Sequence, residues 1–217
     1  MKLYGMPLST RVNKVRMCAY LIGKDFEFEH INLYKKEHKT PEFLAMNVMG
    51  KIPVIDNGGF ILSESNSIMR YLVSLSLEYR LYPTDVQKRA EIDRWLDYVS
   101  MHVDDGINRI MFNKFVAPKV GVNPSERSVK EGVFMVEAAL PVIELQLENH
   151  PFIAGEEMTI ADIGLLSTLD PLEILDIDIT PYQALRKWQE HMKKNDFYSK
   201  THISYKDAFE KYMKSMS

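Results

Sequence analysis

The chain has 217 residues, 46% of them hydrophobic and 26% charged, a composition typical of a folded protein with a sizeable core. Its net charge of -3 provides no basic footprint for nucleic acid, so we expect no nucleic-acid partner. A single cysteine, Cys18, excludes an intrachain disulfide framework and is typical of a reducing compartment. The sequence has neither a signal peptide nor an apolar run of membrane-spanning length, so we expect a cytoplasmic protein without membrane contact.

The first third of the chain mixes strand and helix signals. Residues 2–5 predict a short strand, and residues 11–21 predict a helix with one apolar face that ends at Gly23. Residues 26–33 alternate apolar and polar side chains, which predicts a strand with one buried face. Pro41 begins a short helical turn.

A hairpin and a third helix follow. Two apolar segments, Val54-Ile55 and Phe60-Ile61-Leu62, flank the turn at residues 56–59, which ends in Gly58-Gly59. Ser63 or Ser65 is then expected to cap a helix that carries Ile68 and Leu72. The predicted order of this part is β-α-β-α-β-β-α.

The remainder of the chain has only helical periodicity. Pro83 marks a linker over residues 78–85, and an apolar stripe from Ile92 to Val103 begins the helical part. Further helices are predicted over residues 124–149, from Thr159, around Trp188, and in the weakly amphipathic tail at 205–216. We therefore expect two domains, at residues 1–79 and 86–217.

Ser9 is the first candidate for chemistry, because it lies just before the first predicted helix. A helix N-terminus has unpaired N–H groups and a positive dipole end that favour an anion. A serine hydroxyl at this position can donate a hydrogen bond to a thiolate. The alternative is that Ser9 or Thr10 only caps the helix.

Two further motifs have both a functional and a purely structural interpretation. If the Ile52-Pro53 peptide bond is cis, the Ile52 backbone can pair with an extended ligand, whereas an ordinary trans proline would simply begin a strand. In Ser63-Glu64-Ser65, Glu64 could bind an ammonium group and Ser65 a carboxylate. The structural alternative is a helix start with an acidic first turn.

Other polar residues have structural explanations when taken alone. His38 and Lys39 belong to a charged run typical of a solvated loop, and Lys51 is the kind of residue that is usually exposed. Cys18 falls on the apolar face of its helix and is expected to be inert. Residues 159–162 are similar to a capping box with Asp162 at its end. The histidines lack ligand spacing, so we expect no metal site.

Taken together, in their order and spacing along the chain, these features resemble the glutathione transferase family, nearest to its serine-type theta and plant phi classes. The segments EHKTPEFLAMNVMGKIPVI (37–55) and ESNSIMRYL (64–72) carry the resemblance, which extends weakly through residues 89–96 and 159–162. The resemblance implies an α/β thioredoxin-like N-terminal domain followed by an all-helical C-terminal domain. It also implies a detoxification enzyme that uses glutathione as co-substrate and forms a homodimer.

The resemblance also implies roles for individual residues. Ser9 would stabilise the glutathione thiolate, and a serine here argues against the cysteine-type classes. The remaining contacts to glutathione would come from His38 and Lys39 at the glycyl carboxylate, from Lys51 (where the family more often has Gln), from Ile52 before a cis Pro53, and from Glu64 and Ser65 at the γ-glutamyl end.

The second substrate is expected to be an electrophile with an apolar body. Its pocket would be lined by Leu8, Arg109, Met111, Phe112 and Phe115, although each of these could equally be helical core. Two other functions use the same fold. One is glutathione-dependent peroxide reduction, which needs the same thiolate, and the other is a non-catalytic binding module, which would not need Ser9 or Glu64.

Overall fold

The computed structural model describes residues 1–214, and its N-terminal part is built on a four-stranded sheet of order β2-β1-β3-β4. The strands are β1 (Lys2–Gly5), β2 (Glu27–His30), β3 (Val54–Asn57) and β4 (Phe60–Ser63). β2 runs parallel to β1, and β3 and β4 are antiparallel to their neighbours. The predicted strand over residues 26–33 was too long, because β1 has only four residues with which β2 can pair.

The predicted hairpin between β3 and β4 is confirmed. Gly58 and Gly59 form its turn with φ angles of 69° and 92°. Positive φ at both central residues is the geometry of a tight hairpin turn, which glycine adopts without steric cost.

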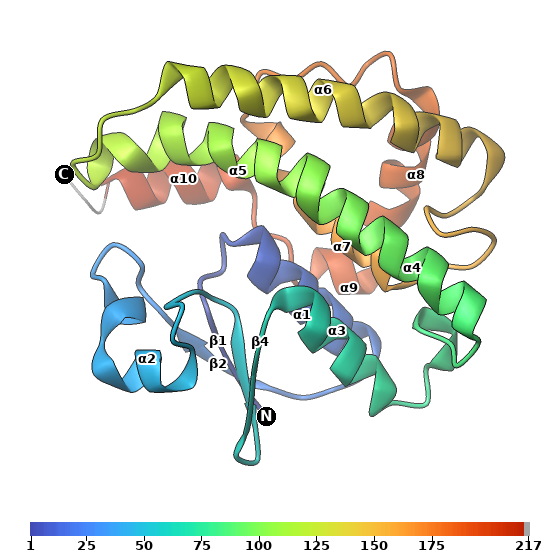
Figure 1. Cartoon of the computed structure of the whole chain (residues 1–217), viewed down its shortest axis with the longest axis horizontal. Helices are drawn as coiled ribbons and strands as arrows, with labels where there is room; N and C mark the ends of the chain where they lie inside the picture. Colours follow the sequence, from blue (N-terminus) through green and yellow to red (C-terminus); the bar gives the residue numbers. More distant parts are fainter. Residues whose placement is uncertain (215–217) are drawn as a thin grey trace.

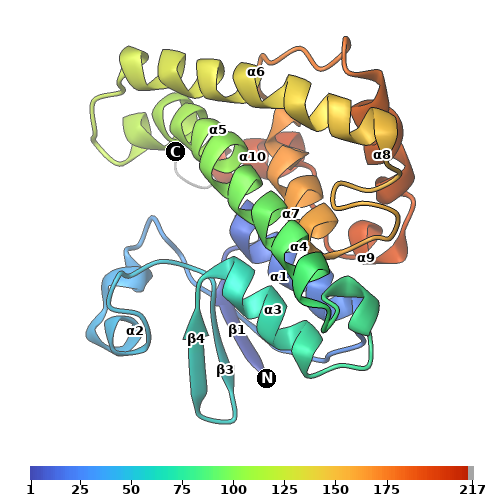
Figure 2. The ribbon, with the colours of Figure 1, turned by 45° about the vertical axis from the view of Figure 1, so that its right-hand side comes forward.

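Three helices accompany the sheet in the predicted order. They are α1 (Thr10–Leu21), α2 (Pro41–Met46) and α3 (Ser65–Ser74), with α1 and α3 on one side of the sheet and α2 on the other (Figures 1 and 2). α1 is buried on more than the single face that its sequence predicted, because it packs against both α3 and a helix of the second part, α7 (Ile160–Leu169). The first helix therefore joins the sheet to the helical part.

In the described residues, the second part consists of helices and their connections, and its only β-structure is an isolated bridge between Phe152 and Gly155. Its first helix is continuous from Val86 to Val116 and contains α4 (Val86–Tyr98), a π-helical segment (Val99–Asp104), α5 (Asp105–Met111) and a second π-helical segment (Phe112–Val116). The buried stripe from Ile92 to Val103 is confirmed. The later helices are α6 (Glu126–Asn149), α7, α8 (Gln183–Lys193), α9 (Asp196–Ser199) and α10 (Tyr205–Lys214). Residues 215 and 216 of the predicted tail helix lie outside the described residues.

Short 3-10 turns connect several of these elements. They are η1 (Glu37–Lys39), η2 (Tyr79–Leu81), η5 (Ala117–Lys119) and η6 (Asp170–Glu173). η2 lies in the predicted linker, but one hydrophobic cluster extends from Leu3 of the sheet to Trp188 of α8. The division at residues 79 and 86 stays a prediction.

α7 is the helix at the centre of the molecule, and all ten of its residues are buried. Its N-terminus carries the predicted capping box, in which the Asp162 carboxylate accepts the Thr159 backbone N–H at 2.8 Å. Asp162 also accepts hydrogen bonds from the Ile153 N–H and the Trp188 indole N–H. A buried carboxylate with several donors fixes the start of this helix. Among the described helices, none has the length and apolar character required to cross a membrane.

Candidate active site

The register of the sheet brings the predicted site residues to one end of the molecule. Tyr4 of β1 pairs with Val54 of β3, which pairs with Ser63 of β4, and Gly5 pairs with His30 of β2. The chain therefore leaves β1, β2 and β4, and enters β3, at the same sheet end. The connections at this end carry Ser9, the pair His38 and Lys39, the segment 51–53, and the pair Glu64 and Ser65.

Ser9 is the N-cap residue of α1, as one of the two interpretations of the sequence predicted. Its Oγ accepts a hydrogen bond from the Val12 backbone N–H at 3.4 Å. A hydroxyl can accept and donate at the same time, so the Ser9 O–H still has a hydrogen to donate. Capping the helix and stabilising an anion are therefore compatible in this geometry.

The first turn of α1 is tied to the helical part by Asp104, which the sequence analysis missed. The Arg11 guanidinium lies 2.7 Å from the Asp104 carboxylate, and the Thr10 hydroxyl donates to the same carboxylate at 3.4 Å. Asp104 ends a π-helical segment, a distortion that often occurs at functional sites. Its buried carboxylate fixes the helix turn that directly follows Ser9.

His38 and Lys39 lie together in η1, next to the loop at Gly50. The Lys39 ammonium donates to the Met49 carbonyl at 3.3 Å, and a Cβ at Gly50 would lie 2.7 Å from the Lys39 Nζ. Gly50 has a φ of 57°, and a Cβ there would also lie 2.8 Å from the His38 carbonyl oxygen, so both its conformation and this backbone contact require glycine. Burial and the neighbouring Lys39 charge lower the pKa of His38. The buried Nδ1 of His38 has no hydrogen-bond partner among the described residues.

The Ile52-Pro53 peptide bond is cis, which confirms the expectation taken from the family resemblance. Pro53 is buried directly before β3, whereas Lys51 is exposed. The Lys51 carbonyl accepts a hydrogen bond from the Asn47 side chain at 2.7 Å, which anchors this loop to the end of α2.

Glu64 is the N-cap residue of α3, and the prediction that Ser63 or Ser65 caps this helix was wrong. No side chain caps α3, and Glu64 itself has a φ of 68°. This conformation is unfavourable for a residue with a Cβ and costs on the order of 1–3 kcal/mol. Strained residues of this kind concentrate at ligand sites. Ser65 is buried in the first turn of α3, whose N–H groups point toward the same end of the sheet.

A buried lysine lies behind this helix start. The Lys14 Nζ of α1 donates to the Asn66 side chain at 2.7 Å, and Asn66 donates in turn to the Ser100 hydroxyl. Burial lowers the pKa of Lys14 to about 8, although the charges of Asp104 and Glu64 act in the opposite direction. No local pattern predicts this contact, because it joins residues that are 52 positions apart.

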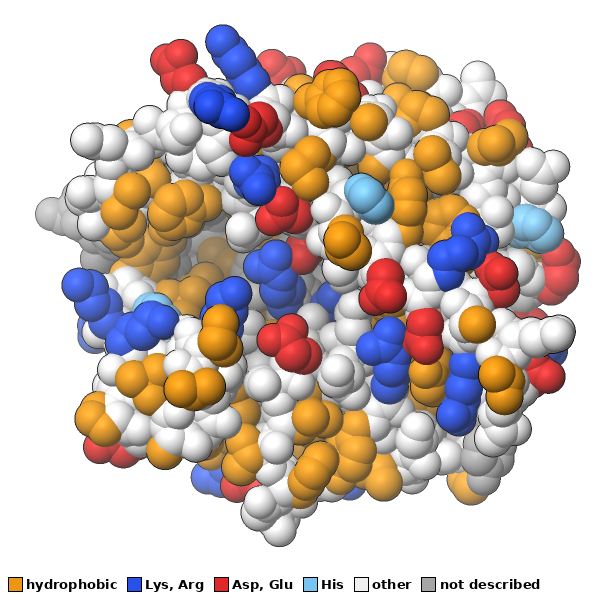
Figure 3. All heavy atoms as spheres, in the orientation of Figure 1, with side chains coloured by type: hydrophobic (Ala, Val, Ile, Leu, Met, Phe, Trp, Pro, Cys, Tyr) orange, Lys and Arg blue, Asp and Glu red, His pale blue; other side chains and the backbone are white. Residues whose placement is uncertain are grey.

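Figure 3 shows a hollow between the surface over α5 and α10 and the surface over α2. Hydrophobic side chains cover its upper wall, and Lys, Arg and His side chains gather on the lower side. An apolar wall opposite a basic rim suits a ligand with an anionic end and an apolar partner.

The five predicted pocket residues differ in their surroundings. Met111 and Phe115 are partly buried against the core, and Phe112 is 39% exposed. Leu8 is half-buried next to Ser9. The Arg109 guanidinium is paired with Asp105 at 2.8 Å and with Glu131 of α6 at 3.4 Å, so its charge already has two partners.

Cys18 is fully buried, as its position on the apolar face of α1 predicted. Burial raises the pKa of its thiol to about 12. A thiol of this kind is neither ionised nor accessible near neutral pH, so Cys18 cannot act as a nucleophile in the folded chain.

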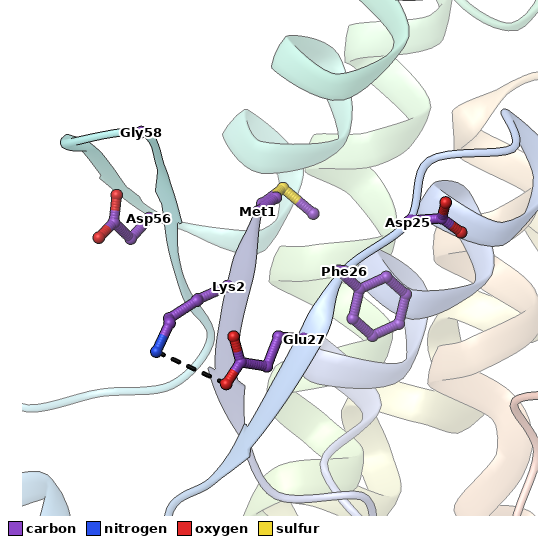
Figure 4. A pocket seen from close by; sticks show the side chains of 7 residues that line it. All are labelled: Met1, Lys2, Asp25, Phe26, Glu27, Asp56 and Gly58. Carbon is purple, nitrogen blue, oxygen red and sulfur yellow. Dashed lines mark ion pairs between the residues drawn. The ribbon is translucent and has the colours of Figure 1, made fainter.

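A second depression lies at the opposite end of the sheet (Figure 4). It encloses about 560 Å³, and charged side chains such as Lys2, Glu27 and Asp56 line it beside Phe26. The Lys2 ammonium is shared between Glu27 at 3.6 Å and Glu29 at 3.5 Å. This depression has none of the helix N-termini that meet at the other end.

A four-stranded sheet with the order of a thioredoxin-like fold, followed by a helical part, defines the fold class of this chain. Comparison with protein families agrees with this assignment. Residues 1–74 match the model for the glutathione S-transferase N-terminal domain, and residues 103–196 match the model for the C-terminal domain.

Individual relatives cover most of the chain. Glutathione S-transferase 3 of Zea mays is 34% identical over 166 residues, which are 75% of this chain and 73% of the relative. A delta-class glutathione transferase structure from Nilaparvata lugens covers 100% of the chain and 99% of its own, with a TM-score of 0.86 and 27% identity. Glutathione transferase F2 of Populus trichocarpa covers 92% and 96%, with a TM-score of 0.82 and 26% identity. The chain therefore belongs to the glutathione S-transferase family.

Proposed function

We propose that this chain, a glutathione transferase by its family, stabilises the thiolate of bound glutathione with the Ser9 hydroxyl and conjugates it to apolar electrophiles. The observation that carries the proposal is the geometry at the start of α1. The Ser9 oxygen is occupied as acceptor by the Val12 N–H, and its hydrogen is left for a ligand.

The energies required for this mechanism are modest. A thiol with a pKa of ~8.5 is ionised to only a few per cent at pH 7. Lowering the pKa by about two units requires roughly 2.7 kcal/mol of preferential thiolate stabilisation. A hydrogen bond to a charged group contributes about 1.5–3 kcal/mol, and a helix N-terminus contributes about 0.3–1 kcal/mol more. Ser9 and the end of α1 are therefore sufficient.

The rest of glutathione would bind along the same end of the sheet. We assign the glycyl carboxylate to His38 and Lys39, with Lys51 beside them. A neutral His38 can still donate from one ring nitrogen, and Lys39 supplies the charge. The Ile52 backbone before cis Pro53 would pair with the cysteinyl unit.

The γ-glutamyl end would bind at the start of α3. Glu64 would receive the amino group, and Ser65 with the first N–H groups of the helix would hold the carboxylate. The positive φ of Glu64 supports this assignment, because strain at a helix start is retained where it serves a ligand.

The electrophile would occupy the apolar wall of the hollow, against Leu8, Met111, Phe112 and Phe115. Arg109 is assigned to the edge of this pocket, since its guanidinium is already neutralised by Asp105 and Glu131. Flexible methionine and aromatic side chains adapt to ligands of different shape, which suits detoxification of varied electrophiles.

We also propose a homodimer in the cytoplasm. Exposed apolar side chains support the dimer: Val48 and Met49 are 84% and 59% exposed on the sheet part, and Met101 is 65% exposed on the helical part. Two-fold symmetry is the commonest closure for such surfaces. Light scattering at micromolar concentration should give the mass of two chains, and the mass of one chain would refute the dimer.

Assays with two substrates test the proposed activity. Purified protein should bind glutathione in calorimetry and conjugate it to a chloronitroaromatic compound. Greater turnover with an organic hydroperoxide would instead favour peroxide reduction by the same thiolate. Binding without turnover of either substrate would indicate a non-catalytic module, and failure to bind millimolar glutathione would overturn the proposal.

A further inference from the structure

Two hydrogen bonds from the helical part hold the main chain on either side of Ser9. The Tyr205 hydroxyl of α10 donates to the Leu8 carbonyl at 2.9 Å, and the Ser167 hydroxyl of α7 donates to the Thr10 carbonyl at 2.7 Å. These two carbonyls belong to the residues on either side of Ser9. The main chain around the catalytic candidate is therefore fixed by two hydroxyls that are 157 and 197 positions away in sequence.

Tyr205 is itself firmly placed. Its side chain is only 2% exposed although it lies at the first residue of the last helix. Its backbone N–H donates to the Glu173 carboxylate at 3.1 Å, which supplies an anionic group at the N-terminus of α10. A buried tyrosine hydroxyl holds its main-chain acceptor in a fixed position, because a tyrosine side chain has only two rotatable bonds.

Behind Tyr205, Glu173 takes part in a cluster with Asp170 and His202. The His202 Nδ1 lies 3.4 Å from the Asp170 carboxylate, and its Nε2 lies 3.2 Å from the Glu173 carboxylate. The Tyr198 ring stacks on the imidazole with centroids 4.6 Å apart, and the Tyr198 hydroxyl donates to Asp170 at 2.9 Å. Two different ring nitrogens lie within 4 Å of two carboxylates, although no hydrogen bond joins Nδ1 to Asp170, and this arrangement favours the protonated imidazole. A metal ion would bind only one nitrogen of the ring.

We propose that Tyr205 is a positioning residue of this enzyme, whose hydroxyl sets the place of Ser9 through the Leu8 carbonyl. The inference rests on the proposed role of Ser9. A hydrogen bond from Ser9 to a thiolate requires placement to within about 0.5 Å. The Leu8 carbonyl is the last main-chain acceptor before Ser9, so loss of its partner frees the peptide that places the hydroxyl.

The substitution Tyr205→Phe tests the proposal, because it removes one hydroxyl and keeps the ring. Tyr98→Phe is the matched control: the Tyr98 hydroxyl also donates to a main-chain carbonyl, that of Ala139, at 3.2 Å, within the helical part. Each variant would be measured without ligand by amide hydrogen exchange over residues 8–12. Each would then be measured with glutathione for kcat, KM and the titration of thiolate absorbance.

We expect Tyr205→Phe to speed exchange over residues 8–12 by about tenfold, the effect of losing roughly 1.4 kcal/mol of local stability. It should also lower kcat several-fold and raise the pKa of bound glutathione, with KM for glutathione changed less than twofold. Tyr98→Phe should leave the exchange of this segment and the thiolate titration unchanged.

Two results would overturn the proposal. One is wild-type exchange over residues 8–12 in Tyr205→Phe. The other is a thiolate titration that overlays the wild type while exchange is faster. If the wild type does not bind glutathione, the proposed function fails, and the exchange comparison still decides whether Tyr205 holds the Ser9 segment.

Discussion

The N-terminus of α1 and the N-terminus of α7 differ in how their polar groups are used. At the start of α7, the buried Asp162 carboxylate is surrounded by donors from Ile153, Thr159 and Trp188. At the sheet end that begins α1 and α3, polar groups keep capacity for further bonds, and Glu64 is held at a positive φ. A buried polar group whose hydrogen bonds are all made within the protein stabilises the fold. A ligand site requires polar groups that can still form hydrogen bonds, and it often contains strained backbone.

The largest effect is expected from Asp162→Ala, which removes the buried carboxylate at the start of α7. It would leave the Ile153 and Thr159 N–H groups and the Trp188 indole N–H buried without this acceptor, at about 1–3 kcal/mol each. We expect a loss of about 4 kcal/mol or more in the free energy of unfolding, measured with urea, and poor recovery of folded protein.

Asp85→Ala is the control for this loss. Asp85 caps α4 through the Lys88 N–H at 2.8 Å in an exposed position, so its removal should cost only about 1 kcal/mol. Equal losses in the two variants would mean that burial and saturation at Asp162 have no special importance.

In contrast to Asp162→Ala, Glu64→Gly should have a large effect on glutathione binding and a small effect on the free energy of unfolding. Glycine relieves the positive φ, so the free energy of unfolding should stay level or rise by up to about 1 kcal/mol. Loss of the carboxylate should weaken glutathione binding by at least tenfold in calorimetry, the equivalent of a charged hydrogen bond.

Lys36→Gly provides the comparison for Glu64→Gly, because Lys36 also has a positive φ, 58°, and is not assigned to the ligand. It should change stability in the same direction and leave glutathione affinity within about twofold. Unchanged affinity in Glu64→Gly would remove the γ-glutamyl assignment.

His202 should make stability depend on pH. Burial lowers the pKa of His202, but the Asp170 and Glu173 carboxylates outweigh this effect, and the net pKa is raised above 6.5. The Lys193 charge opposes the carboxylates, and the Tyr198 ring stacks on the imidazole. A raised pKa in the folded state means that the stabilisation is fully present below pH 6.5 and is lost as the pH rises through the folded pKa. The urea midpoint should therefore fall between pH 6 and pH 8.5 more in the wild type than in His202→Gln. Parallel curves would show that His202 is not charged between the two carboxylates.

The smallest effect is expected at Cys18. Its burial and raised pKa, about 12, predict no reaction with a disulfide reagent at pH 8 until the chain unfolds. Cys18→Ala should keep catalytic activity within about twofold. Rapid labelling of the native protein would contradict the buried position.

The sequence predicted the parts of this molecule that depend on local pattern. The strand and helix order, the Gly58-Gly59 turn and the capping box at Thr159 follow from spacing and turn chemistry over a few residues. The cap of α3 was predicted wrongly, because side-chain preference points to a serine and does not show that Glu64 adopts a positive φ.

The long-range contacts that support the candidate site could not be predicted from local sequence pattern. Asp104 and Lys14 belong to residue types that are usually exposed, His202 belongs to a type of intermediate burial, and the partners of all three are distant in sequence. The histidine spacing gave no sign that His202 meets Asp170 and Glu173, since only the packing of α9 and α10 beside η6 brings the three together.

The central claim is that Ser9 lowers the pKa of bound glutathione, and the thiolate titration of Ser9→Ala tests it most directly. Thiolate absorbance should be followed from pH 6 to 9.5 at saturating glutathione. Ser125→Ala serves as control, because Ser125 caps α6 through the Ser128 N–H in the way that Ser9 caps α1. Both variants should lose about 1 kcal/mol of stability as helix caps.

In the wild type and in Ser125→Ala, the thiolate should titrate with a pKa of about 6.5. In Ser9→Ala the pKa should return toward ~8.5, which lowers the thiolate fraction at pH 7 from about three-quarters to about 3%. The rate at neutral pH should then fall by up to ~25-fold, and the difference should narrow to less than about twofold above pH ~9. A Ser9→Ala titration that overlays the wild type would contradict the claim and leave Ser9 as a helix cap alone.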